Sequence, residues 1–408
     1  MKKIKNILIL AGGDSNRFWP LKRKSYFPFL GKSLLFHQLN TLKDFAEIIV
    51  IIVNKFDLDI AKTTVSQIIN KEKYRFRITS QNPNLKGQSG AILSAKNNIR
   101  GDVLILNAED IFNHEILNKC IDTSIHSTID CLLVAKKVKA YFPGGYLKFK
   151  DNKLREIIEK PKPNFVPSDK VRLVMDYFKD FDRLIHTLEI TETNKDDLYE
   201  NAINQLLKQN LKAEYLLYDD YWYVLKYPWH VLPMMQYFLK TLKNEIKIGK
   251  NVQIAKTAKI VGPCFIDDNT VIGDFVMIRQ SHIGKNCVIG GYSEITRSYV
   301  GDNVSLHRNF VGDSVLDKNV SFGAQAATAN FRFDEKPVQS RVNGIKINTN
   351  LVKFGAIIGF GSKIGVNSTL LPGLKIGKNT FIGPGETIYD DIEDNSFVFK
   401  GKKTKNTT

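Results

Sequence analysis

The stretch IKIGKNVQIAKTAKIVGPCFIDDNTVIGDFVMI (246–278) carries an aliphatic residue at every sixth position. The series runs without a break from Ile248 to Ile278, resumes after a five-residue step, and returns from Ile358 to Ile388. A period of six fits neither an α-helix nor a strand with one buried face. It predicts a parallel β-helix, in which each triangular coil has three sides of about six residues. The aliphatic side chains point inward and stack from coil to coil, because one coil cannot bury its own apolar face. Chance spacing in another β-rich domain would not give six consecutive matches twice.

The composition indicates two domains and argues against a nucleic-acid partner. A chain of 408 residues exceeds the usual size of one core, and its 43% hydrophobic content is that of a globular protein. The net charge of +17 comes from 59 basic and 42 acidic residues. Lysines are spread along the whole chain, and only Lys400–Lys405 forms a short basic run, whereas nucleic-acid binding favours basic residues clustered on one face. Attraction of phosphorylated substrates is compatible with this charge.

Cysteine spacing and the N-terminus predict a cytoplasmic protein without a membrane partner. The four cysteines are Cys120, Cys131, Cys264 and Cys287. They form no CxxC pair and no zinc-type spacing with histidine, so a reducing compartment is expected. The apolar stretch in MKKIKNILILAGG (1–13) is only about five residues long, too short for a signal peptide. No run approaches the roughly 18 apolar residues of a membrane span.

The N-terminal half alternates apolar strands with amphipathic segments. Strands are expected at 5–10, 48–54, 74–81 and 102–110. This alternation predicts a mostly parallel sheet covered on both faces, with ligands bound beyond the carboxyl ends of the strands. Gly12 and Gly13 follow the first strand, where exposed N–H groups would face a phosphate. A plain tight turn is the alternative at this position.

The segment LILAGGDSNRFWPLKRKSYFPFLGKSLL (8–35) resembles the signature of sugar-1-phosphate nucleotidyltransferases, LAGGxGxRLxPLT…KP…P…GKP. In that family the loop wraps a nucleoside triphosphate. The resemblance implies that Arg17 and Lys24 bind its phosphates, the first through a bidentate fork and the second as a point charge.

Further motifs of the same family follow in order along residues 3–240. Gln81 with Gly87–Ala91 resembles Q…GTAGA, which lines the base, and Asn107–Asp110 resembles the strand end that supplies a magnesium-binding carboxylate, here Glu109 or Asp110. Gly145 resembles the glycine near the sugar, and Glu159–Lys160–Pro161 is EKP, whose lysine contacts the sugar phosphate. Tyr199–Ala202 and Trp222–Trp229 resemble the closing segments. Any one motif is weak, but six in the same order favour the family.

Two positions depart from the pattern. Ser15 replaces the third loop glycine, so either the loop turns without positive φ there or Ser15 adopts another geometry. Val224 stands where members often have a second metal-binding aspartate. Either Asp219 or Asp220 substitutes, or one carboxylate suffices with water and phosphate, which Mg²⁺ tolerates.

The β-helix repeat is interrupted between about 322 and 353, and the surrounding sequence suggests a second site. It resembles the acetyltransferase half of bifunctional N-acetylglucosamine-1-phosphate uridylyltransferases of the archaeal type, GHxxYxGDSxxGxxxNxGAGTxTAN…KxGxxIG. The resemblance implies acetyl-CoA as co-substrate, His307 as general base, and roles for Asn330 and Lys353. A histidine suits this task because it titrates near working pH. The alternative is an exposed coil-corner histidine, since Leu306, Phe310 and Ser321 depart from the pattern.

We therefore predict a Rossmann-like α/β nucleotidyltransferase domain (1–240), a left-handed β-helix (245–395) and a basic tail (396–408), with a helical connector at His230–Leu242. The expected reaction joins an NTP, UTP or dTTP, to a sugar 1-phosphate with Mg²⁺, giving UDP-N-acetylglucosamine or a relative. Gln81 can hydrogen-bond uracil or thymine, and guanine is less expected. A trimer or a dimer of trimers is implied by the resemblance. The alternatives are a non-catalytic regulatory protein, and a thymidylyl- or guanylyltransferase whose β-helix is architectural.

Overall fold

The computed structural model describes residues 3–68, 75–195 and 197–405. Tyr74, the first residue of one expected strand, and residues 406–408 of the expected tail lie outside these ranges. The chain forms two units, unit 1 with Met1–Asp14 and Ser33–Tyr223, and unit 2 with Ser15–Lys32 and Val224–Thr408. The domain limits at 240 and 245 stay predictions. Among the described residues, no helix combines the length and apolarity of a membrane span.

Unit 1 is built on one mixed sheet. Its main path is β10 (Lys153–Glu159), β9 (Gly145–Lys150), β11 (Lys170–Phe178), β6 (Val103–Asn107), β1 (Ile4–Ala11), β4 (Ala46–Val53) and β5 (Arg75–Ser80), with β8 (Cys131–Lys137) joining β11 to β12 (Ala213–Leu217). Strands β6, β1, β4 and β5 are parallel, as are β8 and β12, whereas β11 is antiparallel to its neighbours. The predicted α/β fold class is confirmed, with antiparallel strands at one side of the sheet.

Helices cover this sheet. They are α1 (Leu34–Leu42), α2 (Leu58–Ser66), α3 (Gly87–Ser94), α4 (Glu115–His126), α5 (Phe181–Ile190) and α6 (Leu198–Lys208). Leu8 and Leu10 of β1 pack in one core with residues of α3, α5 and α6. Ile7 and Ile9, which alternate to the opposite face, are also buried. Burial on both faces explains why the strands read as continuous apolar runs.

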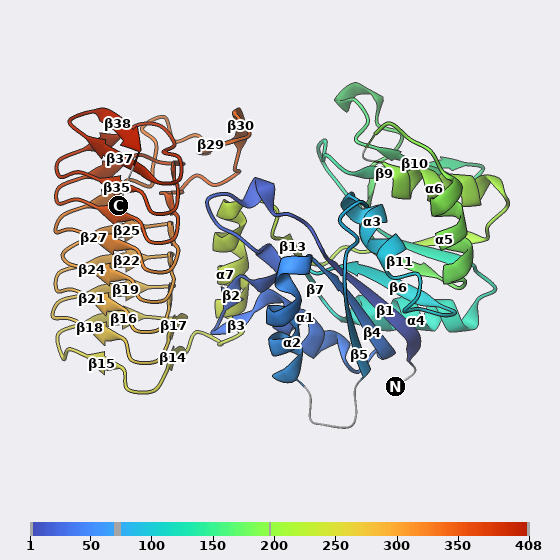
Figure 1. Ribbon diagram of the computed structural model, residues 1–408, viewed down its shortest axis with the longest axis horizontal. Helices are drawn as coiled ribbons and strands as arrows, with labels where there is room; N and C mark the ends of the chain where they lie inside the picture. The colour runs from blue at the N-terminus through green and yellow to red at the C-terminus, as the bar shows by residue number, and fades with distance from the viewer. Residues whose placement is uncertain (1–2, 69–74, 196, 406–408) are drawn as a thin grey trace. The chain divides into compact units, whose positions relative to one another are not determined.

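Unit 2 contains three parallel sheets whose strands stack as successive rungs (Figure 1). The first sheet is β14 (Ile246–Ile248), β17 (Cys264–Ile266), β20 (His282–Ile283), β23 (Tyr299–Val300), β26 (Val315–Leu316), β31 (Ile357–Ile358) and β34 (Lys375–Ile376). The second is β15 (Gln253–Ile254), β18 (Val271–Ile272), β21 (Val288–Ile289), β24 (Ser305–Leu306), β27 (Ser321–Phe322), β32 (Lys363–Ile364) and β35 (Phe381–Ile382), followed by β37 (Ser396–Phe399) and β38 (Lys402–Lys405). The third is β16 (Lys259–Val261), β19 (Met277–Arg279), β22 (Glu294–Thr296), β25 (Phe310–Gly312), β28 (Ala327–Thr328), β33 (Thr369–Leu370) and β36 (Thr387–Ile388).

The register of these sheets explains the six-residue period. In the first sheet the partners in order are Ile248, Ile266, Ile283, Val300, Leu316, Ile358 and Ile376. From Ile266 onward these aliphatic side chains, with counterparts in the other two sheets, form the core of the β-helix, whereas Ile248 in the first coil is half-exposed. The predicted β-helix fold is confirmed.

Two segments leave or extend the stack. Between β28 and β31 the chain forms a hairpin of β29 (Gln339–Val342) and β30 (Ile345–Asn348), which projects from the coils (Figure 1). The segment from 396, expected as a loose basic tail, instead contains β37 and β38. Strand β37 continues the second sheet because Val398 lies in register with Ile382 and is buried, and β38 folds back against it.

The outer side of the first sheet is covered within unit 2. His282 is 3% exposed and stacks between Phe265 and Tyr299, with ring centroids 4.9 and 4.4 Å away. Helix α7 (Val231–Lys240), which lies within the predicted connector, contributes the Phe238 ring 5.0 Å from Phe29. Among the described residues neither ring nitrogen of His282 has a hydrogen-bond partner. This face is therefore a layer of stacked aromatic rings.

Burial lowers the pKa of His282 to about 4, from an ordinary value of 6.5. The unfolded chain gains a proton as the pH falls below 6.5, whereas the folded ring stays neutral to about pH 4, so acid favours unfolding across this window. One pKa unit corresponds to about 1.4 kcal/mol, so His282 alone should lower the free energy of unfolding by on the order of 3 kcal/mol as the pH falls from 6.5 to about 4.

We expect His282→Phe to flatten the fall in the free energy of unfolding between pH 6.5 and 4, measured by denaturant titration. His230, whose pKa burial also lowers to about 4, is unchanged in both proteins and cancels in the comparison. Identical pH profiles for the two proteins would contradict the proposed origin of the acid sensitivity.

Candidate functional site

The glycine loop of unit 1 lies directly against Gln81. A Cβ atom at Gly12 would sit 2.1 Å from the Gln81 Oε1, so glycine allows the loop to lie directly against this side chain. The Gln81 amide nitrogen donates to the carbonyls of Leu85 at 2.7 Å and Gly87 at 3.2 Å, at the start of α3. The structure therefore brings three of the predicted residues, Gly12, Gln81 and Gly87, to the carboxyl end of β1. A Cβ atom at Gly13 would meet nothing within 4 Å.

The two predicted phosphate cations belong to unit 2, together with the β-helix. Arg17 lies in the short helix η1 (Asn16–Phe18), and Lys24 begins η2 (Lys24–Tyr26). Ser15 precedes η1 with φ 58° and ψ 22°. The serine thus adopts the left-handed conformation that glycine takes at less cost, and its Oγ accepts from the Lys24 N–H at 3.4 Å.

The predicted metal carboxylates lie where β6 ends. Glu109 follows this strand and is half-buried, and Asp110, which begins β7 (Asp110–Phe112), is 4% exposed. Within the described residues, no cluster of three or more His, Cys, Asp or Glu could hold a metal. One or two carboxylates nevertheless fit Mg²⁺, which commonly takes its remaining ligands from water and phosphate.

Asp220, considered from the sequence as a substitute ligand, already has structural partners. Its Oδ2 accepts from the Asn113 amide at 2.7 Å, and its Oδ1 accepts from the Tyr221 N–H at 2.7 Å. The hydrogen bond from Asn113 lowers the pKa of this carboxyl most. Val224 lies on β13 (Trp222–Val224), the strand paired with β7.

The predicted sugar-site residues lie together on the β9–β10 hairpin. Gly145 and Glu159 are register partners, and a Cβ atom at Gly145 would sit 3.1 Å from the Glu159 Oε2. Lys160 follows with φ 45°, its N–H donates to the Gly144 carbonyl at 3.0 Å, and its Nζ is 2.9 Å from Glu159 Oε1. Glycine at 145 therefore lets Ile157 and Glu159 pack closely against the backbone of β9.

A buried ion cluster lies behind this hairpin. The Arg172 guanidinium donates to Asp176 at 2.6 Å and to Glu200, and the Tyr199 hydroxyl donates to Asp176 at 3.0 Å. All four residues are buried. Burial, opposed by the charge of Arg172, raises the pKa of Asp176 to about 6. The position of a Cβ atom at Gly145 would be 3.8 Å from Arg172 Nε, so the cluster reaches the sugar-site residues.

Sequence reasoning named Tyr199 and Glu200 but missed Arg172 and Asp176. The available signal was a pair of opposite charges, four residues apart, inside the otherwise apolar strand KVRLVMDYF (170–178). Charged residues are rarely buried unless they are paired.

In unit 2 the predicted acetyl-transfer residues fall at two different corners of the β-helix. His307 is exposed at the corner before β25, where its N–H donates to Asn309 Oδ1 at 2.7 Å. Asn330 follows β28, and its carbonyl accepts from the Phe354 N–H at 2.9 Å, next to the exposed Lys353. The structure brings Asn330 and Lys353 together. It places His307 at the other end of these strands, before β25, whereas Asn330 follows the neighbouring strand β28.

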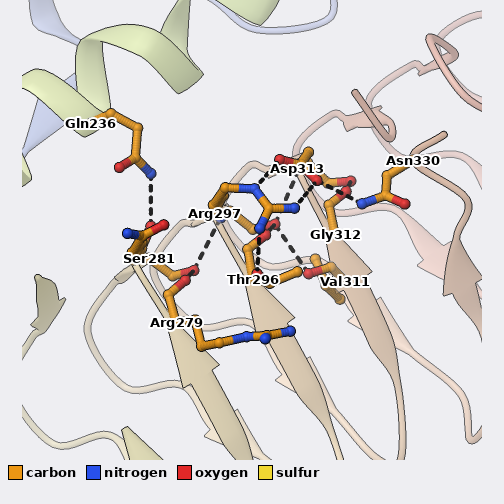
Figure 2. Close-up of polar contacts among 12 residues, drawn as sticks. Gln236, Arg279, Ser281, Thr296, Arg297, Val311, Gly312, Asp313 and Asn330 are labelled. Atoms are coloured by element: carbon orange, nitrogen blue, oxygen red, sulfur yellow. Dashed lines mark hydrogen bonds and ion pairs between the residues drawn. The ribbon is translucent and has the colours of Figure 1, made fainter. Parts of the chain in front are cut away.

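Asn330 is fixed by a carboxylate at the corner after β25. Figure 2 shows Arg297 and Asn330 approaching Asp313 from two sides. Arg297 pairs with both oxygens of Asp313, at 2.6 and 2.7 Å, and the Asn330 amide nitrogen donates to Asp313 Oδ2 at 2.6 Å. Since a carboxylate only accepts, the nitrogen of Asn330 must face it, and Oδ1 points away. A Cβ atom at Gly312 would lie 2.6 Å from this nitrogen, so glycine is required there.

Comparison with known proteins places this geometry in a family. The family model described as "Nucleotidyl transferase" matches residues 6–223. The "Bifunctional protein GlmU" of Methanococcus aeolicus is 30% identical, with 96% of this chain and 97% of the relative covered. The "Bifunctional sugar-1-phosphate nucleotidylyltransferase/acetyltransferase" of Sulfurisphaera tokodaii is 29% identical, over 94% and 97%. The chain therefore belongs to the nucleotidyl transferase family, on the branch of the bifunctional GlmU proteins.

The ion cluster generates a stability prediction. We expect Arg172→Met to lower the free energy of unfolding of unit 1 by about 3–5 kcal/mol, because it leaves Asp176 and Glu200 buried without their cation. Denaturant titration measures this change.

Lys96→Met is the matched control, since Lys96 and Glu189 form a half-exposed pair at 2.6 Å and such pairs contribute about 1 kcal/mol or less. If Arg172→Met lowers the free energy of unfolding no more than the control does, the guanidinium of Arg172 does not hold the cluster together.

Proposed function

We propose that this nucleotidyltransferase joins UTP to N-acetylglucosamine 1-phosphate, or to a close relative of that sugar phosphate, and releases pyrophosphate. The observation that carries the proposal is the contact of Gly12 with Gln81 at the start of α3. It provides a glycine loop for phosphate and an amide for a base at the carboxyl end of one strand, where such sheets bind nucleotides. Full-length similarity to proteins named as bifunctional transferases supports the sugar-phosphate substrate.

The choice of base follows from the orientation of Gln81. Its amide nitrogen is occupied by two backbone carbonyls, so Oε1 is the group left for the base. An acceptor suits the N3–H of uracil or thymine, whereas cytosine presents an acceptor at the same position. UTP and dTTP are therefore favoured over CTP.

The reaction needs charge and position rather than a protein nucleophile. A sugar phosphate oxygen attacks the α-phosphorus of the nucleotide in line while pyrophosphate leaves. Arg17 and Lys24 would neutralise the triphosphate, and Lys160 would orient the attacking phosphate. Glu159, the register partner of Gly145, would accept from a sugar hydroxyl or from its acetamido N–H. The non-catalytic alternative is not favoured, since these groups and the family assignment agree.

We further propose that Glu109 or Asp110 holds Mg²⁺, which supplies charge neutralisation on the phosphates when bound. The double variant Glu109→Gln/Asp110→Asn should lose Mg²⁺-dependent pyrophosphate release. The two single variants should identify the metal ligand, because one should lose most of this activity and the other little of it. Full activity in the double variant would place the metal elsewhere.

A second activity, acetyl transfer from acetyl-CoA to an amino-sugar phosphate, is proposed for the β-helix. His307 would act as general base, and Asn330 would offer its Oδ1 to an N–H donor while Lys353 meets the phosphate. Since His307 and Asn330 lie at opposite ends of β25 in one chain, a complete site would need a neighbouring copy. This supports the proposed homotrimer, which a solution mass of 46.4 kDa would overturn.

Lys160→Ala should raise the KM for the sugar phosphate by about tenfold to hundredfold, because a lost hydrogen bond between charged groups costs roughly 1.5–3 kcal/mol. The KM for UTP should change much less in the same steady-state assay. Lys148→Ala is the control, because Lys148 is also half-exposed on this hairpin and also pairs with a glutamate, at 3.0 Å from Glu156. Equal effects of Lys160→Ala on both substrates would contradict its role.

His307→Ala should reduce acetylation of glucosamine 1-phosphate by about 10²–10⁴-fold, the usual cost of losing a general base. Nucleotidyl transfer should be unchanged in this variant, and the exposed His186 of α5 provides a control substitution, His186→Ala. A wild-type chain without acetylation would leave the β-helix architectural. Undiminished acetylation in His307→Ala would show that another group is the base.

A further inference from the structure

The segment Ser15–Lys32, here called the phosphate arm, carries Arg17 and Lys24 and belongs to the β-helix unit. Trp19 lies two residues beyond Arg17, next to the end of η1. Its indole Nε1 donates to Asp394 Oδ1 at 2.8 Å, and the Lys375 Nζ lies 4.8 Å from the centre of its ring. The arm is therefore tied to residues more than 350 positions away in the sequence.

The partners of Trp19 are rigid parts of the β-helix. Asp394 Oδ1 also accepts from the Lys378 N–H at 3.0 Å, which joins two successive coils. Lys375 is 4% exposed, pairs with Asp391 at 3.1 Å and donates to the Arg341 carbonyl of β29. The attraction between a cation and the face of an aromatic ring is stronger when the cation is held away from water.

The distal half of the arm is fixed on the same unit. The Phe27 ring lies 4.8 Å from Tyr299 of β23, and the Phe29 ring stacks on Phe238 of α7 at 5.0 Å. Both arm phenylalanines are buried. The arm is thus held by an aromatic layer at one end, and at the other by the contacts of Trp19 with Asp394 and Lys375.

We propose that Trp19, Asp394 and Lys375 are positioning residues for Arg17, through which the last coils of the β-helix set the affinity of the nucleotidyltransferase for its NTP. Arg17 lies in a three-residue helix whose own hydrogen bonds cannot fix a long side chain, so its place depends on the neighbouring anchor. Ser15 constrains the other side of η1 by its positive φ. The inference rests on the proposed role of Arg17 in binding phosphate.

The test compares Asp394→Ala, Asp394→Asn and Trp19→Phe in the full chain. Asp394→Ala removes the acceptor, Asp394→Asn keeps an oxygen for Trp19 and for the Lys378 N–H, and Trp19→Phe keeps a ring but removes the donor. We expect the KM for UTP to rise about tenfold in Asp394→Ala and Trp19→Phe, because a hydrogen bond to a charged group contributes roughly 1.5–3 kcal/mol. The KM for the sugar phosphate should stay within twofold, and Asp394→Asn should approach wild type.

Asp268→Ala is the matched control for damage to a coil corner. Asp268 accepts from the Lys250 N–H at 2.7 Å and pairs with Lys285, the same cap that Asp394 provides for Lys378. The temperature of thermal unfolding should fall by a similar amount in Asp268→Ala and in Asp394→Ala. Only Asp394→Ala should also change the KM for UTP. The double variant Trp19→Phe/Asp394→Ala should raise the KM for UTP no further than the single variants do. Both changes remove the same hydrogen bond, between Trp19 and Asp394.

Three outcomes would overturn the proposal. They are an unchanged KM for UTP in Asp394→Ala, an equal rise for both substrates, and an equal rise in the Asp268→Ala control. Calorimetric titration with UTP separates this inference from the proposed function. If the wild-type chain neither binds UTP nor turns it over, both the proposed function and this inference are wrong. If the wild type and Asp394→Ala bind UTP with the same affinity, only this inference is wrong.

Discussion

Inward stacking of one aliphatic side chain for every six residues is the constraint on which the structure of unit 2 depends. Ile248, Ile266 and their successors lie in one register column, so each coil is held in place by the coils before and after it. A coil cannot shift without exposing its whole apolar set. The corners of the prism are therefore fixed points, and His307, Asp313 and Asp394 all occupy such corners. Polar side chains can be carried on the corners because they are not needed to fill the apolar interior.

In unit 1 the equivalent constraint is that buried charge must be paired. Arg172 is shared by Asp176 and Glu200, and the Tyr199 hydroxyl donates to the same Asp176 oxygen that pairs with Arg172. This cluster lies behind Gly145 and Glu159, where the sugar phosphate is proposed to bind. Buried groups that are paired in this way cannot relax into water, so they reorganise little. The same low-dielectric surroundings make the loss of any one partner expensive.

Close approach and charge are supplied by different parts of the glycine-rich segment. Gly12 lies against Gln81 within unit 1, whereas Arg17 and Lys24 belong with the β-helix. The division falls between Asp14 and Ser15, and Ser15 has the left-handed backbone expected of a turn residue. An enzyme that works by placing charge rather than by a nucleophile is sensitive to where such cations are held. Within unit 2, Trp19 anchors the segment that carries these cations to the last coils of the β-helix.

The sequence by itself determined the β-helix, the alternating α/β half and the order of the nucleotidyltransferase motifs, because each is encoded in local periodicity or in contiguous residues. It also identified Ser15 as a departure, but the positive φ at that residue emerged only in the fold. Tertiary structure alone decided that Arg172 pairs with both Asp176 and Glu200, that Val398 adds a strand where a loose tail was expected, and that Trp19 bonds to Asp394. These contacts join residues far apart in the chain. Their partners are selected by how coils and strands stack in space, which no local pattern of side chains records.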